Sequence, residues 1–331
     1  MDVNTSIKGK KVFRYGNYDR YYGYRLSLSG SDIDSSKVWN DPRLSILKKK
    51  YFKKRTVLDI GCNAGYLTIA MAKELRPRLM FGIDLDGILI SKARKVLNLR
   101  AQEISQTQTT QKMRSEDFSE GESDSDSQLL SFANYHYKGQ SIYEDSPQSI
   151  DATTSIETVL RRFPYNVYFK TENFLTEPHF FSQYDTITCF SVTKWIHLNW
   201  GDKGLVYLFL KAYSLLKPRG LFILEYQEWK SYQRKAHYTE AIAETFQGIR
   251  IHPEQFVSIL QKIGMQLVSN RKVSSNTELE HSETKGFNRP IAVFRKVGKE
   301  LAFDMREVTL ENMDSFVSMD AYVWCVFCDI V

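Results

Sequence analysis

The sequence has few cysteines and no long apolar run. Its four cysteines (Cys62, Cys189, Cys325 and Cys328) form neither a disulfide framework nor a zinc pattern, since only the last two approach metal spacing and no second pair accompanies them. No apolar segment approaches the roughly 20 residues that span a bilayer. The first residues, MDVNTSIKGKKVF, lack the apolar region of a secretory signal. We therefore expect a soluble intracellular protein in a reducing compartment, with no bound metal and no membrane association.

The charge of the chain is unevenly distributed. The net charge of the 331 residues is +6, but residues 101–155 contain ten acidic and three basic residues, so the rest of the chain carries +13. A basic body favours a polyanionic partner, although charge alone does not separate a nucleic acid from a membrane surface. The 19 tyrosines suit stacking on bases, but most tyrosines in any protein are simply half-buried.

Short apolar runs alternate with helical stretches from Thr56 onward. Strands are expected at 56–60, 79–83, 166–170, 184–190, 221–225, 266–269 and 291–295, and helices at 65–75, 87–99, 203–215 and 253–263. This alternation predicts an α/β fold with a mainly parallel sheet. The last two strands have no proper helix between them, which predicts an antiparallel edge hairpin.

Three parts are expected along the chain. Residues 1–55 form a basic and aromatic N-terminal segment that packs on the catalytic domain, and residues 56–297 form that domain. An acidic, Ser-rich stretch at about 101–160 interrupts it, and its composition predicts a disordered insertion. Residues 298–331 form a C-terminal tail to which the sequence assigns no role.

A glycine-containing loop follows the first expected strand of this domain. The strand TVLDI runs into Gly61-Cys62-Asn63-Ala64-Gly65, where glycines let the backbone approach a bound nucleoside. The next strand ends at Asp84, 23 residues after Gly61, where an acid binds ribose hydroxyls in nucleotide-binding folds. The spacing is not GxGxxG, and it is typical of Rossmann-like class I S-adenosylmethionine-dependent methyltransferases. The alternative is a structural glycine turn with a surface aspartate.

Five sequence blocks carry a resemblance to one family. They are Tyr15–Arg25 (YGNYDRYYGYR), Asp59–Asn63 (DIGCN), Thr193–Asp202 (TKWIHLNWGD), Glu225–Trp229 (EYQEW) and Lys285–Pro290 (KGFNRP). Together they resemble the bicoid-interacting-protein-type RNA methyltransferases, and within them the branch of 7SK RNA methylphosphate capping enzymes, which carries an insertion at the same point. Relatives that methylate 5′-monophosphates lack the first block. One departure is Glu228, where the family has proline.

The resemblance implies S-adenosylmethionine as the cofactor, held by residues from several blocks. The implied contacts are Tyr22, Arg43, Gly61, Cys62, Asn63, Asp84, Leu85, Asn173 and Phe174. Arg43 could hold the methionine carboxylate as a bidentate pair. Asp84 would take the ribose, and Asn173 and Phe174 would border the adenine.

The expected acceptor is a terminal phosphate, which is already ionised at neutral pH and needs alignment and charge neutralisation rather than a general base. The expected catalytic residues around it are Tyr21, Arg25, Lys194 and His197. A structural role for His197 and a solvated Lys194 remain alternatives. The basic stretches 10–25 and 48–55 could follow an RNA backbone, although Lys48-Lys49-Lys50 could equally be an exposed helix end.

The sequence and the resemblance together predict methylation of the 5′-terminal γ-phosphate of a small non-coding, 7SK-like RNA. The expected partners are an RNA with a 5′ triphosphate and a La-related protein of the same particle, with a monomeric catalytic unit in the nucleus or, alternatively, the cytoplasm. A 5′-monophosphate methyltransferase, a methyltransferase of small molecules or protein side chains, and a scaffold that retains its RNA remain alternatives.

Overall fold

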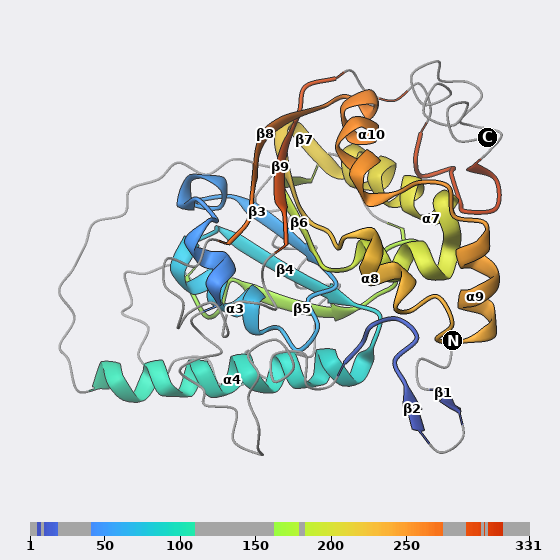
Figure 1. Cartoon of the computed structure of the whole chain (residues 1–331). Helices are drawn as coiled ribbons and strands as arrows, with labels where there is room; N and C mark the ends of the chain where they lie inside the picture. The colour runs from blue at the N-terminus through green and yellow to red at the C-terminus, as the bar shows by residue number, and fades with distance from the viewer. Residues whose placement is uncertain are drawn as a thin grey trace.

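A seven-stranded sheet forms the centre of the protein in the computed structural model (Figure 1). The structure describes residues 5–7, 10–18, 41–109, 162–178, 183–273, 289–298, 301 and 304–313. The strands are β3 (Thr56–Ile60), β4 (Leu79–Asp84), β5 (Val167–Thr171), β6 (Tyr184–Phe190), β7 (Leu216–Glu225), β8 (Met265–Arg271) and β9 (Ile291–Lys296). Their order is β5-β4-β3-β6-β7-β9-β8, and β9 runs antiparallel to both neighbours while the other pairs are parallel.

Helices cover both faces of this sheet (Figure 1). They are α3 (Tyr66–Leu75), α4 (Gly87–Thr109), α7 (Thr193–Leu215), α8 (Trp229–Gln233), α9 (Glu240–Gln247) and α10 (Phe256–Ile263), with short 3-10 turns η1 (Pro42–Ser45), η2 (Lys49–Tyr51) and η4 (Pro253–Gln255). The apolar cores on the two faces are distinct: α7 and α10 pack on one, and α3 and α4 on the other. Because both faces are buried, the parallel strands read as continuous apolar runs.

The predicted α/β class with an antiparallel edge is confirmed, and three element predictions are wrong in detail. Helix α4 continues to Thr109, beyond the predicted end at Leu99 and into the segment assigned to the insertion; residues 110–161 lie outside the described residues. Helix α7 begins at Thr193 rather than Lys203. A first helical stretch precedes Gly201, whose φ of 64° and ψ of −166° kink the chain, and the predicted helix corresponds to the second stretch. The sequence pattern also missed α8 and α9, which are too short to show a clear period.

The described part of the N-terminal segment has two pieces that precede the main domain. Strands β1 (Thr5–Ile7) and β2 (Lys10–Val12) form an antiparallel hairpin. Residues 13–18 then lie against the start of α7: Arg14 Nε donates to Asn199 Oδ1 at 2.7 Å, and the rings of Tyr15 and Trp200 stack with centroids 5.6 Å apart. Residues 13–18 therefore pack on the start of α7, and the division of the chain at residue 55 stays a prediction.

Part of the C-terminal tail belongs to the core. Met305, Val308 and Met313 are each at most 5% exposed and lie in the cluster that includes α7 and α10. The Tyr207 hydroxyl donates to the backbone oxygen of Val308 at 2.9 Å. Residues 304–313 thus cover the outer side of α7. None of the described helices has the length and apolarity needed to cross a membrane.

Candidate active site

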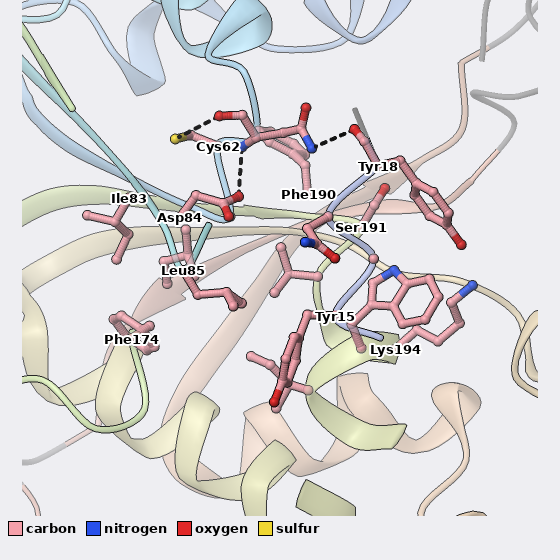
Figure 2. A pocket seen from close by; sticks show the side chains of 18 of the residues that line it. Tyr15, Tyr18, Cys62, Ile83, Asp84, Leu85, Phe174, Phe190, Ser191 and Lys194 are labelled. Atoms are coloured by element: carbon pink, nitrogen blue, oxygen red, sulfur yellow. Dashed lines mark hydrogen bonds between the residues drawn. The ribbon is translucent and has the colours of Figure 1, made fainter. Parts of the chain in front are cut away.

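The order of the strands reverses between β3 and β6, and a pocket opens at the carboxyl ends of these strands. Adjacent parallel strands whose crossovers run in opposite directions leave a crevice at this point, where α/β folds bind ligands. The cavity measures about 690 Å³, within the range of small-molecule sites. Residues 13–18 and 172–175, the loop at Gly61 and the start of α7 contribute to its walls. In Figure 2, Asp84, Leu85 and Phe174 lie on one side of the pocket and Lys194 and Tyr18 on the other.

The Gly61 loop has a conformation that glycine alone satisfies easily. Gly61 has φ +72°, and a Cβ there would lie 2.3 Å from Val192 Cγ2, so the loop packs directly on the residue before α7. The next residues turn back toward β4, and the amide of Asn63 donates to Asp84 Oδ2 at 2.9 Å. The side chain of Asn63 donates to the Tyr18 carbonyl at 3.4 Å, which ties residues 13–18 to the same loop.

Asp84 projects into the pocket with its orientation fixed by backbone donors. Its Oδ1 accepts from the amide of Asp86 at 3.0 Å, in addition to the Asn63 contact. Burial raises the pKa of Asp84 to about 6, because the ionised form loses hydration that the two amides only partly replace. A carboxylate in this position can accept hydrogen bonds from ribose hydroxyls.

Arg43 lies in the pocket wall and is bound by two carboxylates of the protein itself. Its Nε and Nη2 contact Asp41 at 2.9 and 2.6 Å, and its Nη1 contacts Glu225 at 3.2 Å. Arg43, Asp41 and Glu225 are all at most 3% exposed. The sequence suggested a bidentate pair between Arg43 and a ligand carboxylate; in the structure the bidentate partner is Asp41.

Six further expected cofactor residues converge on the same pocket. Gly61, Cys62, Asn63, Leu85, Asn173 and Phe174 all line it. Asn173 Oδ1 accepts from the amide of Leu175 at 3.1 Å, which fixes the turn that presents the buried ring of Phe174. Tyr22 lies outside the described residues, as do the expected catalytic residues Tyr21 and Arg25.

Lys194 is the expected catalytic residue that the structure places in the pocket. It is 7% exposed, its Nζ donates to Ser231 Oγ at 3.1 Å and lies 4.6 Å from the centroid of the Trp195 ring. Burial lowers the pKa of Lys194 to about 7, and the positive charges of Arg289, Lys235 and Arg234 lower it further. All four cations line the same cavity.

His197 does not line the pocket. Its side chain is fully buried between Tyr232 and Phe256, and Nε2 lies 2.6 Å from Asp202 Oδ1. Burial lowers the pKa of His197. Asp202 also accepts from the amides of Arg250 and Ile251. The histidine therefore orients Asp202, which in turn fastens Arg250 and Ile251 to α7, and this agrees with the structural alternative for His197.

The sequence patterns missed several groups that line the pocket. The cations Arg234, Lys235 and Arg289 and the polar residues Asn17, Ser191 and Gln227 were not among the expected site residues. Arg289 and Gln227 lie inside two of the sequence blocks that carried the family resemblance, so membership of these blocks could have indicated them as site residues. Arg234 and Lys235 follow α8, a short helix with no clear sequence pattern.

The chemistry of the pocket fits S-adenosylmethionine, which has a ribose, an adenine and an amino acid end. Asp84 supplies a ribose acceptor and Phe174 an apolar ring surface. Two buried amide oxygens, Asn17 Oδ1 and Gln227 Oε1, have no protein partner among the described residues and suit an ammonium group. The orientation of both amides is set, because their nitrogens donate to Asp86 Oδ2 and to the Ser191 carbonyl.

The fold and the pocket define the class. Counted from β3, the strand order is 3-2-1-4-5-7-6 with the seventh strand antiparallel, which is the arrangement of class I S-adenosylmethionine-dependent methyltransferases. The solved structure of the N-methyltransferase NodS from Bradyrhizobium japonicum with S-adenosyl-L-homocysteine aligns with a TM-score of 0.45 at 12% identity, over 86% of this chain and 98% of that chain. The fold assignment itself rests on the strand order.

Sequence comparison gives the family. Residues 184–296 match the model of Bicoid-interacting protein 3 (Bin3). A probable RNA methyltransferase of Arabidopsis thaliana is 36% identical over 87% of this chain and 82% of its own length. The human 7SK snRNA methylphosphate capping enzyme is 34% identical over 87% of this chain, which spans 40% of that enzyme. The U6 snRNA methylphosphate capping enzyme Amus of Drosophila melanogaster is 29% identical over 86% of this chain and 75% of its own length. The chain belongs to the Bin3 family.

Proposed function

We propose that this protein transfers a methyl group from S-adenosylmethionine to the 5′-terminal phosphate of an RNA. The observation that carries the proposal is the division of one pocket into two halves of opposite character. One half presents Asp84 and Phe174, which suit a nucleoside, and the other presents Lys194 with three further cations. A nucleoside cofactor and a phosphate acceptor can therefore meet inside one cavity.

The cofactor supplies an electrophilic methyl group, so the protein has to position the acceptor oxygen and neutralise its charge. Lys194 is suited to this task because it is partly desolvated and anchored by Ser231. An arriving phosphate dianion stabilises the protonated lysine, which raises the pKa of Lys194 from about 7. Tyr21 and Arg25 remain proposed contacts to the same phosphate, and His197 acts through the fold of α7.

The preferred substrate is the γ-phosphate of a 5′-triphosphate on a small non-coding RNA of the 7SK kind. Two relatives, named as 7SK and U6 snRNA capping enzymes, support a small RNA. A mouse RNA 5′-monophosphate methyltransferase is 27% identical over 65% of this chain, so a monophosphate is the second candidate. A nuclear location, a monomeric catalytic unit and a La-related partner in the RNA particle complete the proposal.

The decisive experiment compares RNAs of one sequence that end in a 5′ triphosphate, monophosphate or hydroxyl. With labelled S-adenosylmethionine, we expect fast methylation of the triphosphate RNA and none of the hydroxyl RNA. The label should resist a phosphatase that removes unsubstituted 5′-terminal phosphates and should be released by a pyrophosphatase that cleaves the phosphoanhydride bonds of the 5′ triphosphate. Equal labelling of the hydroxyl RNA would place the methyl group on a base or sugar and would refute the proposal. Faster reaction of the monophosphate RNA would favour the second candidate.

A further inference from the structure

Ser191 is the centre of a buried hydrogen-bond network at the floor of the pocket. Its hydroxyl donates to Glu225 Oε2 at 2.5 Å and accepts from Arg289 Nη1 at 2.7 Å. Its carbonyl accepts from Gln227 Nε2 at 3.1 Å. Ser191 has φ +64°, a left-handed conformation that residues other than glycine rarely adopt. The surrounding contacts therefore hold a strained residue at the carboxyl end of β6, labelled in Figure 2.

The network connects Arg289 to Arg43, which also lines the pocket. Glu225, fully buried at the end of β7, accepts from Ser191 and also from Arg43 Nη1 at 3.2 Å. Arg43 in turn contacts Asp41. From Arg289 through the Ser191 hydroxyl, the network continues to Glu225, Arg43 and Asp41, so that its two cations and two carboxylates alternate and their charges balance. The hydrogen bond to Ser191 at the end of this network orients the side chain of Arg289. The pairing of Glu225 with Ile291 across β7 and β9 fixes the backbone beside Arg289.

We propose that Arg289 binds the acceptor phosphate directly, together with Lys194, and that Ser191 and Glu225 are positioning residues for its guanidinium. The proposal rests on the proposed function and adds a residue to its acceptor site. A guanidinium presents a planar fork of donors, so one nitrogen can be anchored while others contact a phosphate. Arg289 and Lys194 line one cavity and act electrostatically on each other, so a phosphate that contacts both relieves the repulsion between the two cations.

A purely structural role for Arg289 would predict a different outcome from a role in binding. If the guanidinium served only to balance Glu225, its replacement would lower stability and leave the preference for phosphorylated RNA intact. If it binds phosphate, the loss falls on the Michaelis constant for phosphorylated RNA and on the ratio of binding between phosphorylated and hydroxyl-ended RNA. Affinity for S-adenosylhomocysteine would remain close to that of the unmodified protein.

The test uses the full chain with Arg289→Gln, Arg289→Lys and Ser191→Ala, and Lys73→Gln as a control that removes an exposed cation near the end of α3 remote from the pocket. For Arg289→Gln we expect the KM for 5′-phosphorylated RNA to rise about 10- to 100-fold, as for a lost charge-assisted contact. In Arg289→Lys, which keeps the positive charge, the rise in KM should be smaller than in Arg289→Gln. Ser191→Ala, which removes the hydroxyl that links the guanidinium to Glu225, should raise KM about 3- to 10-fold. Lys73→Gln should match the unmodified protein.

Two results separate failure of this inference from failure of the proposed function. If the unmodified protein does not prefer phosphorylated RNA, the proposed function fails. If it does, and Arg289→Gln keeps both KM and that preference, the Arg289 assignment is overturned. Should Arg289→Gln fail to fold, Arg289→Lys decides, because it keeps the charge but loses the fork: an unchanged KM and preference in that variant also overturn the assignment.

Discussion

The backbone amide of Asn63 donates to Oδ2 of Asp84 at 2.9 Å, which joins the loop after β3 to the end of β4. This contact presets the carboxylate before any ligand binds, because Oδ1 is held at the same time by the amide of Asp86. A preoriented acceptor reduces the entropy that binding has to remove. The arrangement gives Asp84 a definable effect on cofactor affinity and on its pH dependence.

Asp84→Asn should weaken cofactor binding by about 1.5–3 kcal/mol, the value of a charge-assisted hydrogen bond. The pKa of Asp84 is raised to about 6, so in the unmodified protein affinity should also fall as the pH drops below 6 and the carboxylate takes up a proton. In Asp84→Asn this dependence should be reduced. Calorimetry between pH 5 and pH 8 checks both effects. Asp59, whose pKa is also about 6, is unchanged in the variant and serves as the internal control.

Arg43→Ala should lower the free energy of unfolding by about 3–5 kcal/mol, because Asp41 and Glu225 would both remain buried without their shared cation. Denaturant unfolding measures this. Adding Glu225→Gln to Arg43→Ala should restore part of the stability, since one unpaired charge is removed. An Arg43→Ala protein as stable as the unmodified one would mean that the two carboxylates are protonated or hydrated in solution.

Lys194→Ala should lower single-turnover methylation at saturating RNA by about tenfold or more while changing RNA affinity less, because its contact aims the phosphate oxygen. Neutralising Lys10 and Lys11 should instead weaken RNA binding and flatten its salt dependence. Binding titrations at two salt concentrations, run beside the single-turnover assay, separate the two effects. A wild-type rate in Lys194→Ala would show that other residues hold the phosphate.

The rate at low RNA concentration should fall as pH rises through about 7, because the pKa of Lys194 is lowered to about 7 and the neutral amine no longer attracts phosphate. In Lys194→Arg the guanidinium stays protonated, so the decrease in rate should occur at a higher pH than in the unmodified protein. The pH profile of kcat/KM from pH 6 to pH 9 reports it. Identical profiles for the two proteins would assign the titration to another group.

Removing residues 299–331 should destabilise the protein more than removing residues 314–331. The longer deletion takes away Met305, Val308 and Met313 from the core beside α7, each worth roughly 1.5–3 kcal/mol when fully buried. Thermal unfolding of the two truncated proteins provides the comparison. Equal melting temperatures would mean that residues 304–313 contribute little to this core.

The sequence by itself determined the parts of the fold that depend on short-range patterns. Continuous apolar runs gave the buried parallel strands, and the loop at Gly61 followed by Asp84 gave the nucleoside end of the pocket, because both depend on spacing along one β-α-β unit. The resemblance of five blocks gave the family, which the comparisons confirm.

Other features were decided only by the tertiary structure. No local pattern shows that Arg43 meets Glu225, 182 positions later, or that Arg289, just before β9, meets Ser191, just after β6, across β7. His197 and Lys194 share one motif, yet residues three apart on a helix project at angles about 60° from each other, and here packing turns one side chain into the core and the other into the pocket. The cluster of cations exists because α7, α8 and the start of β9 converge at one edge of the sheet. Sequence order holds no record of that convergence, since it is set by how the helices pack on the strands.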